Sequence, residues 1–280
     1  MTKKGDWPRV LIVTKYPFNL RDGGGIALTN FFHGWPTANI AQAYFDGPHG
    51  EPDKSVCKLY YRLTHQEIKR IWPLSLFDRW RSGSETLSMP IPPSLNVQVK
   101  STKSIFRQVR VQLKIIISNQ LRKYGLPFAI DCKMSDDLAK FVDQFQPHIV
   151  FTTLGDLAII RLTNQLSDEL NIPLAIQICD DWMSDQYVRG IYAKFMRDKL
   201  DTELRDSFDR ASVRFSICQT MTDAYLKRYG KDFEPLPVPV ACYEWEGSHK
   251  VNERKDKKLV VLYAGSIHQF GQLQSLVDIA

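Results

Sequence analysis

The sequence predicts an α/β fold in which a parallel sheet is covered by helices on both faces. Short apolar runs with the length of strands alternate along the chain with longer stretches of helical periodicity. The strand candidates are almost wholly apolar, as expected for strands that are buried on both faces, and the loops that lead from a strand into the next helix are short. This alternation predicts parallel strands joined by helical crossovers.

The elements are assigned in chain order from their composition and periodicity. Strands are predicted at 9–14, 39–45, 148–153, 174–179 and 212–218, and helices at 26–33, 104–124, 136–145, 155–171 and 220–229. One more long helix is indicated by apolar residues that recur every four positions on one face, namely Tyr192, Met196, Leu200, Leu204 and Phe208. Gly230 is predicted to cap the last of these helices. Residues 47–94 have weak periodicity, and no element is assigned there.

A change in composition near residue 246 predicts a domain boundary. Residues 1–245 are expected to form one domain, and the charged stretch 246–258 is expected to be a linker. A new apolar strand at 259–263 and the start of a helix then follow up to residue 280. One strand and part of a helix cannot bury a core. We therefore expect 259–280 to be the incomplete beginning of a second domain.

Composition narrows the class of protein. The five cysteines are scattered and include no C-x-x-C pair, which is typical of reduced thiols in a cytoplasmic protein. The first apolar run covers only residues 10–13, too short for a secretory signal, and no run approaches the roughly 18 apolar residues of a membrane span. The histidines form no metal-binding pattern and G-x-S-x-G is absent, so no metal site or hydrolase nucleophile is predicted.

The net charge of +6 is concentrated in one region. No acidic residue occurs between Glu85 and Asp131, and the helix at 104–124 carries a basic stripe of Lys103, Arg107, Arg110 and Lys114. This stripe can attach the protein to an anionic membrane surface at the inner face of the membrane. The alternative is a core-facing helix with a solvated charged side, whose apolar stripe contains Phe106, Val109, Leu113 and Ile116. Nucleic acid is not predicted as a partner, because no motif that reads it is present.

Three consecutive glycines, Gly23, Gly24 and Gly25, follow the first predicted strand. They match neither G-x-G-x-x-G, because Leu28 stands in place of the third glycine, nor the P-loop pattern. Glycines before a helix expose backbone amides to an anion or let a sugar approach closely. A flexible connection between strand and helix is the alternative.

Two adjacent carboxylates and a tryptophan, Asp180, Asp181 and Trp182, follow the predicted strand at 174–179. Burying both carboxylates without partners would be costly, so we expect them to be exposed in a cleft. There they could accept hydrogen bonds from sugar hydroxyls while Trp182 offers an apolar face. Alternatively, Asp181 caps the next helix and Asp180 is merely solvated. Ligands of open parallel sheets bind beyond the carboxyl ends of the strands, so the turns after Thr14, Thr153 and Cys179 are expected to share one edge.

Four segments together resemble the family 4 type of glycosyltransferase, which has the GT-B fold of two Rossmann-like domains. RVLIVTKYPFNLRDGGGIALTNFF resembles the first strand and glycine-rich loop of that family, and AIQICDDW resembles its strand with an acidic acceptor-side motif. SICQTMTDAYLKRYGKDFEPLPVPV is similar to the stretch that enters the interdomain hinge, and LVVLYAGSIHQFGQLQSLVDIA resembles the opening of the donor-binding domain. Val238 departs from the pattern, because it stands where the hinge usually has Asn.

The resemblance implies a retaining, metal-independent glycosyltransferase with a nucleotide-sugar co-substrate, no other cofactor, and a sugar or glycolipid acceptor. It implies that Gly23, Gly24 and Gly25 lie near the reacting centre, that Asp180, Asp181 and Trp182 contact substrate, and that Gly265 and Ser266 face the donor phosphates. It also places the family's paired glutamates beyond Ala280. This chain is then expected to hold the acceptor-side domain and only the beginning of the donor domain. The alternative function is a non-catalytic, degenerate transferase domain that acts as a partner or membrane-associated scaffold.

Overall fold

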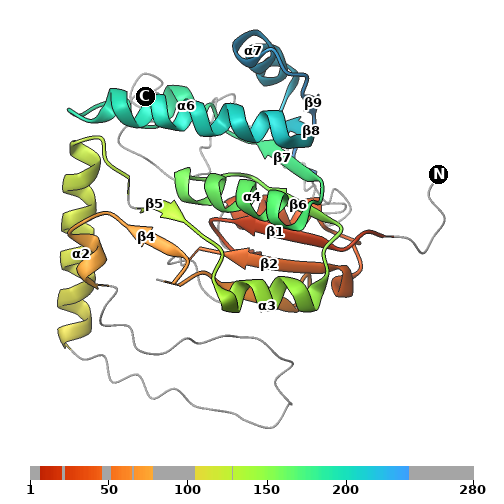
Figure 1. Ribbon diagram of the computed structural model, residues 1–280, viewed down its shortest axis with the longest axis horizontal. Helices are drawn as coiled ribbons and strands as arrows, with labels where there is room; N and C mark the ends of the chain where they lie inside the picture. Colours follow the sequence, from red (N-terminus) through yellow and green to blue (C-terminus); the bar gives the residue numbers. More distant parts are fainter. Residues whose placement is uncertain are drawn as a thin grey trace, which may run out of the picture. The chain divides into compact units, whose positions relative to one another are not determined.

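A parallel sheet of seven strands forms the centre of the fold (Figure 1). The computed structural model describes residues 7–20, 23–45, 52–64, 66–77, 105–127 and 129–239. The strands of this sheet are β1 (Val10–Thr14), β2 (Ile40–Tyr44), β3 (Leu59–Arg62), β6 (Ile149–Thr152), β7 (Leu174–Ile178), β8 (Ala211–Ser216) and β9 (Glu234–Pro235). Every neighbouring pair in the sheet is parallel.

Helices connect and cover these strands. They are α1 (Gly23–Phe31), α2 (Ile105–Lys123), α3 (Asp136–Phe145), α4 (Leu157–Leu170), α5 (Trp182–Asp185), α6 (Ala193–Arg210) and α7 (Gln219–Tyr229), with the 3-10 helices η1 (Thr37–Asn39) and η2 (Leu74–Phe77). A separate antiparallel pair is formed by β4 (Ile68–Arg70) and β5 (Ala129–Cys132). The predicted α/β class with a parallel sheet is confirmed, and the fold is Rossmann-like.

The strand order β3-β2-β1-β6-β7-β8-β9 contains one reversal. The chain builds outward from β1 to β3 and then returns to place β6 on the other side of β1, with Val10 opposite Ile149. Loops that leave β1 and β6 therefore depart from adjacent strand ends toward opposite faces, which opens a crevice between them. In sheets of this kind that switch point is the usual place of ligand binding.

Alternate residues of the strands pack into two apolar cores on opposite faces of the sheet. Leu11 and Val13 of β1 belong to the core that α3, α4 and α6 cover, and these helices lie on the near face in Figure 1. Val10 and Ile12 belong to the second core, which contains Leu28 of α1. Both faces of the sheet are thus covered, as the apolar composition of the strands predicts.

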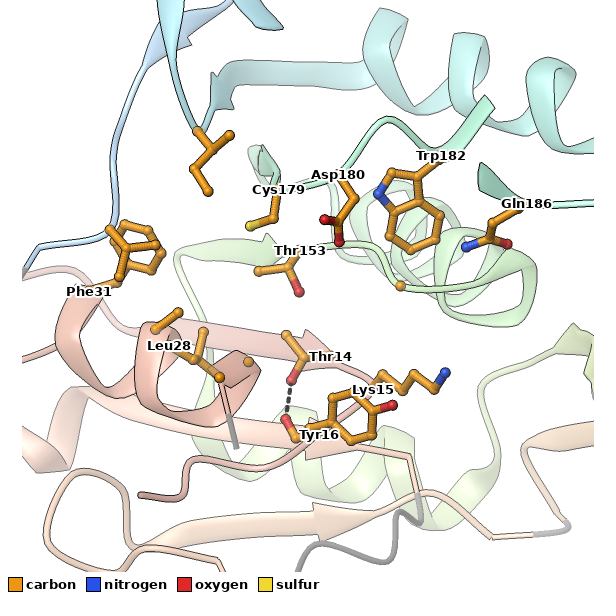
Figure 2. A pocket seen from close by; sticks show the side chains of 16 residues that line it. Thr14, Lys15, Tyr16, Leu28, Phe31, Thr153, Cys179, Asp180, Trp182 and Gln186 are labelled. Atoms are coloured by element: carbon orange, nitrogen blue, oxygen red, sulfur yellow. Dashed lines mark hydrogen bonds between the residues drawn. The ribbon is translucent and has the colours of Figure 1, made fainter. Parts of the chain in front are cut away.

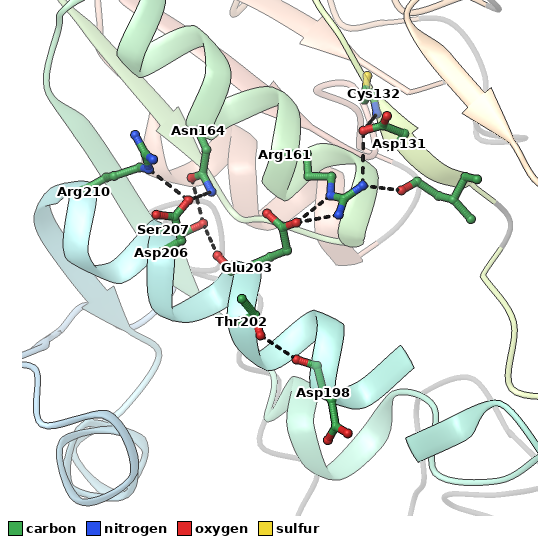
Figure 3. A network of polar contacts seen from close by, with 11 residues as sticks. Asp131, Cys132, Arg161, Asn164, Asp198, Thr202, Glu203, Asp206, Ser207 and Arg210 are labelled. Atoms are coloured by element: carbon green, nitrogen blue, oxygen red, sulfur yellow. Dashed lines mark hydrogen bonds and ion pairs between the residues drawn. The ribbon is translucent and has the colours of Figure 1, made fainter. Parts of the chain in front are cut away.

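A polar network fixes α6 against α4 (Figure 3). Arg161 on α4 donates to Glu203 on α6 through Nε at 2.7 Å and to the carbonyl of Ile130 through Nη1 at 3.0 Å. Deeper in the same interface, the buried Ser207 hydroxyl donates to Asn164 Oδ1 at 2.8 Å. A fully satisfied buried network specifies one alignment of two helices, so it also fixes where the segment before α6 must lie.

Most elements predicted from periodicity are confirmed to within about two residues. The predicted helix at 136–145 coincides with α3, and Gly230 caps α7 in the left-handed conformation with φ of 65°. On α6, the predicted apolar face is buried at Met196, Leu200, Leu204 and Phe208. Tyr192 is wrong as a member of that face, because it precedes the first helical residue and is 47% exposed.

Three predictions need correction. The helix after β1 begins at Gly23 and not at residue 26, so the glycines form the first turn of α1. The region without assigned elements contains β3, β4 and η2, and β5 was also not predicted. These elements are only three or four residues long, so their sequences contain too few repeats of the strand period to distinguish them from loops. The apolar stripe of α2 does not face the core at Leu113 and Ile116, which are both exposed.

The described residues belong to the first of two units into which the chain divides, Met1–Val240 and Ala241–Ala280. The predicted linker at 246–258 and the predicted start of a second domain at 259–280 lie outside the described residues. Within the described ranges, no helix combines the length and the apolar character needed to cross a membrane.

Candidate functional site

A pocket with a volume of about 490 Å³ opens at the switch point of the sheet. Figure 2 shows Thr14, Lys15 and Tyr16 on one side of it and Cys179, Asp180 and Trp182 on the opposite side. The volume lies within the range of about 300–1,000 Å³ that is typical of small-molecule sites. The sequence-based expectation that the turns after β1, β6 and β7 share one edge is confirmed.

The structure brings together some of the predicted substrate-binding residues and leaves others outside. Gly23, Gly24, Asp180 and Trp182 line the pocket. Gly25 and Asp181 do not belong to its lining. The predicted phosphate contacts Gly265 and Ser266 lie outside the described residues.

The three glycines differ in their surroundings. A Cβ added to Gly23 would meet nothing within 4 Å, whereas a Cβ added to Gly25 would lie 2.1 Å from Nδ2 of Asn19. Asn19 is buried, and its amide donates to the carbonyl of Pro17 at 2.9 Å. Gly25 is therefore needed for the close packing of α1 against Asn19. Gly23 and Gly24, in the first turn of α1, line the pocket, and the first amides of an α-helix have no acceptor in a preceding turn.

The two adjacent aspartates have different environments. Asp181 accepts hydrogen bonds from Arg228 and from the Ser184 hydroxyl, and the hydrogen bond from Arg228 is the main reason that the pKa of Asp181 is lowered. It occupies the N-cap position of α5 without a capping hydrogen bond from its side chain. Asp180 is exposed and lines the pocket. Of this pair, only Asp180 lines the pocket.

Trp182, which was expected to offer an apolar face in the cleft, lines the pocket but is largely buried. Its side chain is 6% exposed, and its indole Nε1 has no hydrogen-bond partner among the described residues. Figure 2 shows this indole at the pocket wall, with the nitrogen on the side of Asp180. A buried donor without a partner is costly, and a ligand in the pocket can supply the missing acceptor.

Gly155 lies close to both Lys15 and Trp182 at the pocket. Its φ of +111° disfavours other residues, and an added Cβ would lie 3.3 Å from Cβ of Lys15 and 3.8 Å from Cη2 of Trp182. From the sequence, Gly155 is assigned only as the first residue of the predicted helix at 155–171. Its role depends on a contact between three separate segments, which no local pattern could show.

Lys15 supplies the positive charge in the pocket lining, and the sequence-based site does not include it. Near it, Asp156 caps α4 by accepting from the amides of Ala158 and Ile159 at 3.0 and 3.1 Å. Burial raises the pKa of Asp156, while the charge of Lys15 and the two amides act in the opposite direction. Because Lys15 directly follows β1, the rule on strand ends could have identified it.

The remaining lining is apolar on one side. Leu28 and Phe31 of α1 face this part of the pocket together with Ile217 and Val238. The hydroxyl of Thr14 is already used, because it donates to the carbonyl of Tyr16 at 2.9 Å and accepts from Gln42 at 2.8 Å. The pocket can thus bind a ligand that combines hydroxyl groups, a negative charge and some apolar surface.

The predicted membrane-binding stripe is only partly described. Lys103 lies outside the described residues, while Arg107, Arg110 and Lys114 lie on α2 with their backbones described.

In the described ranges, no group of three or more His, Cys, Asp or Glu side chains is arranged to hold a metal ion. A search of this sequence against protein-family models and curated proteins gave no match.

Proposed function

We propose that this chain takes part in glycosyl transfer and that the switch-point pocket binds a sugar substrate. The proposal rests on one observation: Asp180 and Trp182, whose buried Nε1 has no partner among the described residues, line the same pocket as the glycine start of α1. A carboxylate and an indole N–H suit sugar hydroxyls, which both donate and accept hydrogen bonds. The first-turn amides of α1 favour an anionic group such as a phosphate.

The proposed roles follow from these chemical properties. Asp180 accepts hydrogen bonds from two hydroxyls of the sugar, and Trp182 donates to a sugar oxygen. Lys15 and the first turn of α1 stabilise negative charge on the donor phosphate or on the leaving group. Leu28 and Val238 contact the apolar parts of the ligand. These residues bind, orient and stabilise charge, and none of them is assigned as a nucleophile.

The finer assignment combines this pocket with the resemblance of the sequence to family 4 glycosyltransferases. We propose that the described unit is the acceptor-side domain of a GT-B enzyme that retains the configuration of the sugar and uses no metal. In such a mechanism the leaving phosphate assists the attack of the acceptor. A protein nucleophile is then unnecessary, which agrees with the roles given above.

Calorimetric titration of the whole chain with uridine- and guanosine-diphosphate sugars tests the proposal, together with an assay of nucleotide release. We expect binding, and we expect Trp182→Phe to weaken it about tenfold, because this variant keeps the aromatic bulk and removes the N–H group. Thr202→Val on α6 changes a polar side chain that is not in the pocket lining and serves as the control. The proposal would be contradicted if none of these ligands binds. Because this chain is expected to hold only the beginning of the donor domain, we expect weak donor binding and little or no nucleotide release. Brisk release would contradict that expectation.

A further inference from the structure

An exposed apolar surface runs from α2 to the beginning of α6. Residues three and eleven positions apart lie on the same face of an α-helix, so Leu113, Ile116 and Tyr124 share one side of α2 and its C-terminal turn. All three side chains are exposed, including 55% of Ile116. This surface continues through Ile191, Tyr192 and Phe195, of which Ile191 is 76% and Phe195 65% exposed. Single exposed apolar residues are ordinary, but a contiguous group marks a contact surface.

The two halves of this surface are joined by backbone contacts. The amide of Tyr192 donates to the carbonyl of Tyr124 at 3.1 Å. Gly190 is packed so closely that an added Cβ would lie 2.2 Å from the carbonyl carbon of Tyr124. The φ of Gly190 is +112°, and this conformation turns the chain there into α6. The C-terminal turn of α2 and the start of α6 are therefore adjacent, and we call the exposed apolar residues on both the α2–α6 ridge.

Basic residues outnumber acidic ones around the α2–α6 ridge, although the exposed Asp198 lies one turn after Phe195 on α6. Neither 105–127 nor 186–197 contains an acidic residue. Basic residues occur in both stretches, and Arg122, Lys123, Arg189 and Lys194 are all exposed. A partner that combines apolar and negatively charged groups is complementary to this arrangement.

We propose that the α2–α6 ridge docks on the surface of a bilayer that contains anionic lipid. Aromatic and aliphatic side chains would enter the boundary between headgroups and acyl chains, and the surrounding Lys and Arg would contact lipid phosphates. Tyrosines suit this boundary, because one end of the side chain is apolar and the other polar. The proposal extends the predicted attachment of α2 to a second segment, the start of α6. It stands independently of what the pocket binds.

Co-sedimentation of the whole chain with lipid vesicles tests the proposal. The probes are vesicles of phosphatidylcholine alone and of phosphatidylcholine mixed with phosphatidylglycerol. We expect the chain to bind the mixed vesicles more strongly, and we expect salt to weaken this binding because it screens the charges. Equal binding to both vesicle types, or none to the mixed vesicles, would overturn the proposal.

A matched pair of double variants locates the surface. Lys194→Gln with Phe195→Ser removes one charge and one apolar side chain from the ridge, and we expect it to reduce binding to the mixed vesicles roughly tenfold or more. Lys227→Gln with Leu226→Ser makes the same kind of change on exposed residues of α7 and is expected to change binding less than about twofold. Equal losses from both variants would overturn the assignment.

Two further measurements keep the test decisive. Arg189→Gln with Ile191→Ser, on the exposed segment before α6, is expected to repeat the loss of binding without changing the circular dichroism spectrum. Sedimentation velocity without lipid tests whether the ridge is instead an interface between two copies of the chain. A dimer that Lys194→Gln with Phe195→Ser dissociates would overturn the membrane proposal.

Discussion

Arg228 on α7 donates two parallel hydrogen bonds to Asp181, from Nη1 to Oδ1 at 2.5 Å and from Nη2 to Oδ2 at 3.1 Å. This geometry assigns the two neighbouring aspartates to different tasks. Asp181 links the loop after β7 to α7, while Asp180 lines the pocket. Two identical side chains that are adjacent in sequence thus provide a matched pair for mutation.

We predict that Asp180→Asn weakens sugar binding about tenfold or more, because a hydrogen bond to a charged group contributes about 1.5–3 kcal/mol. Asp181→Asn is expected to change binding by less than about twofold, since its carboxylate contacts Arg228 and not the pocket. Calorimetric titration of both variants with the same ligand measures the difference. Equal losses in the two variants would show that the pocket uses both carboxylates.

The pair between Asp181 and Arg228 also predicts a dependence of stability on pH. Folding lowers the pKa of Asp181. The pair therefore adds to the free energy of unfolding at pH values above the unfolded pKa of about 3.9, and this addition is lost as the pH falls through the lowered pKa. Both side chains are about one-third exposed, and solvent therefore limits the contribution. We expect Arg228→Gln to reduce the free energy of unfolding by up to about 1 kcal/mol at neutral pH.

The difference between wild type and Arg228→Gln should shrink in acid, as urea denaturation at several pH values would show. A remainder that does not depend on pH is expected from the stacking of Arg228 on Tyr225, whose ring centroid lies 5.6 Å from the guanidinium carbon. A difference that grows as the pH falls would contradict the assignment.

Substitution of the glycines in α1 separates packing from ligand binding. We predict that Gly25→Ala lowers the free energy of unfolding by about 1–3 kcal/mol, because the new methyl group would overlap the buried amide of Asn19. Gly23→Ala meets open space and is expected to change stability by less than about 0.5 kcal/mol. Urea denaturation measures both values. A similar loss for the two variants would contradict the assignment, because helix propensity favours alanine at both positions and only residue 25 faces Asn19.

Cys179 provides a chemical reporter at the pocket wall. Burial raises its pKa to about 11, so only a small fraction is thiolate at neutral pH. In a variant that lacks the exposed Cys218 and also Cys242, we expect a thiol reagent to modify Cys179 slowly at neutral pH. The rate should rise about tenfold for each unit of increasing pH, up to about pH 11.

A ligand that occupies the pocket should slow the modification of Cys179. Cys57 is the internal control, because it is fully buried, lies outside the pocket lining, and has a pKa raised to about 12. Mass spectrometry after timed labelling distinguishes the two thiols. Equal protection of both would indicate general stabilisation of the fold and not occupancy of this pocket.

The sheet could be predicted from sequence because its signals are local. The strand candidate at 148–153 and the helix that follows it each show their own period, and alternation then dictates parallel pairing. The place of the pocket follows from the same rule, because the ends of parallel strands share one edge. The loops after β1 and β7 were therefore correctly brought together, although 165 positions separate Thr14 from Cys179 (179 − 14).

The details of the pocket depend on contacts that a sequence does not display. The pairing of Asp181 with Arg228 joins residues 47 positions apart. Trp182 was expected to offer an apolar face in the cleft, and its side chain is only 6% exposed there. Gly155, which has a positive φ, lies near both this indole and Lys15, although the three residues belong to separate segments. Short elements such as β5 were missed because four residues contain too little periodicity.

The pocket exists only while the sheet is intact, because residues from near Thr14, Thr153, Asp180 and Val238 meet there across most of the described chain. An unfolded chain therefore has no such site, and any molecule that occupies it must raise the melting temperature. At a free concentration of one hundred times the dissociation constant, this coupling stabilises the folded state by about 2.7 kcal/mol. Thermal denaturation in the presence of a panel of carbohydrates and nucleotides can thus identify the natural ligand before any reaction is known.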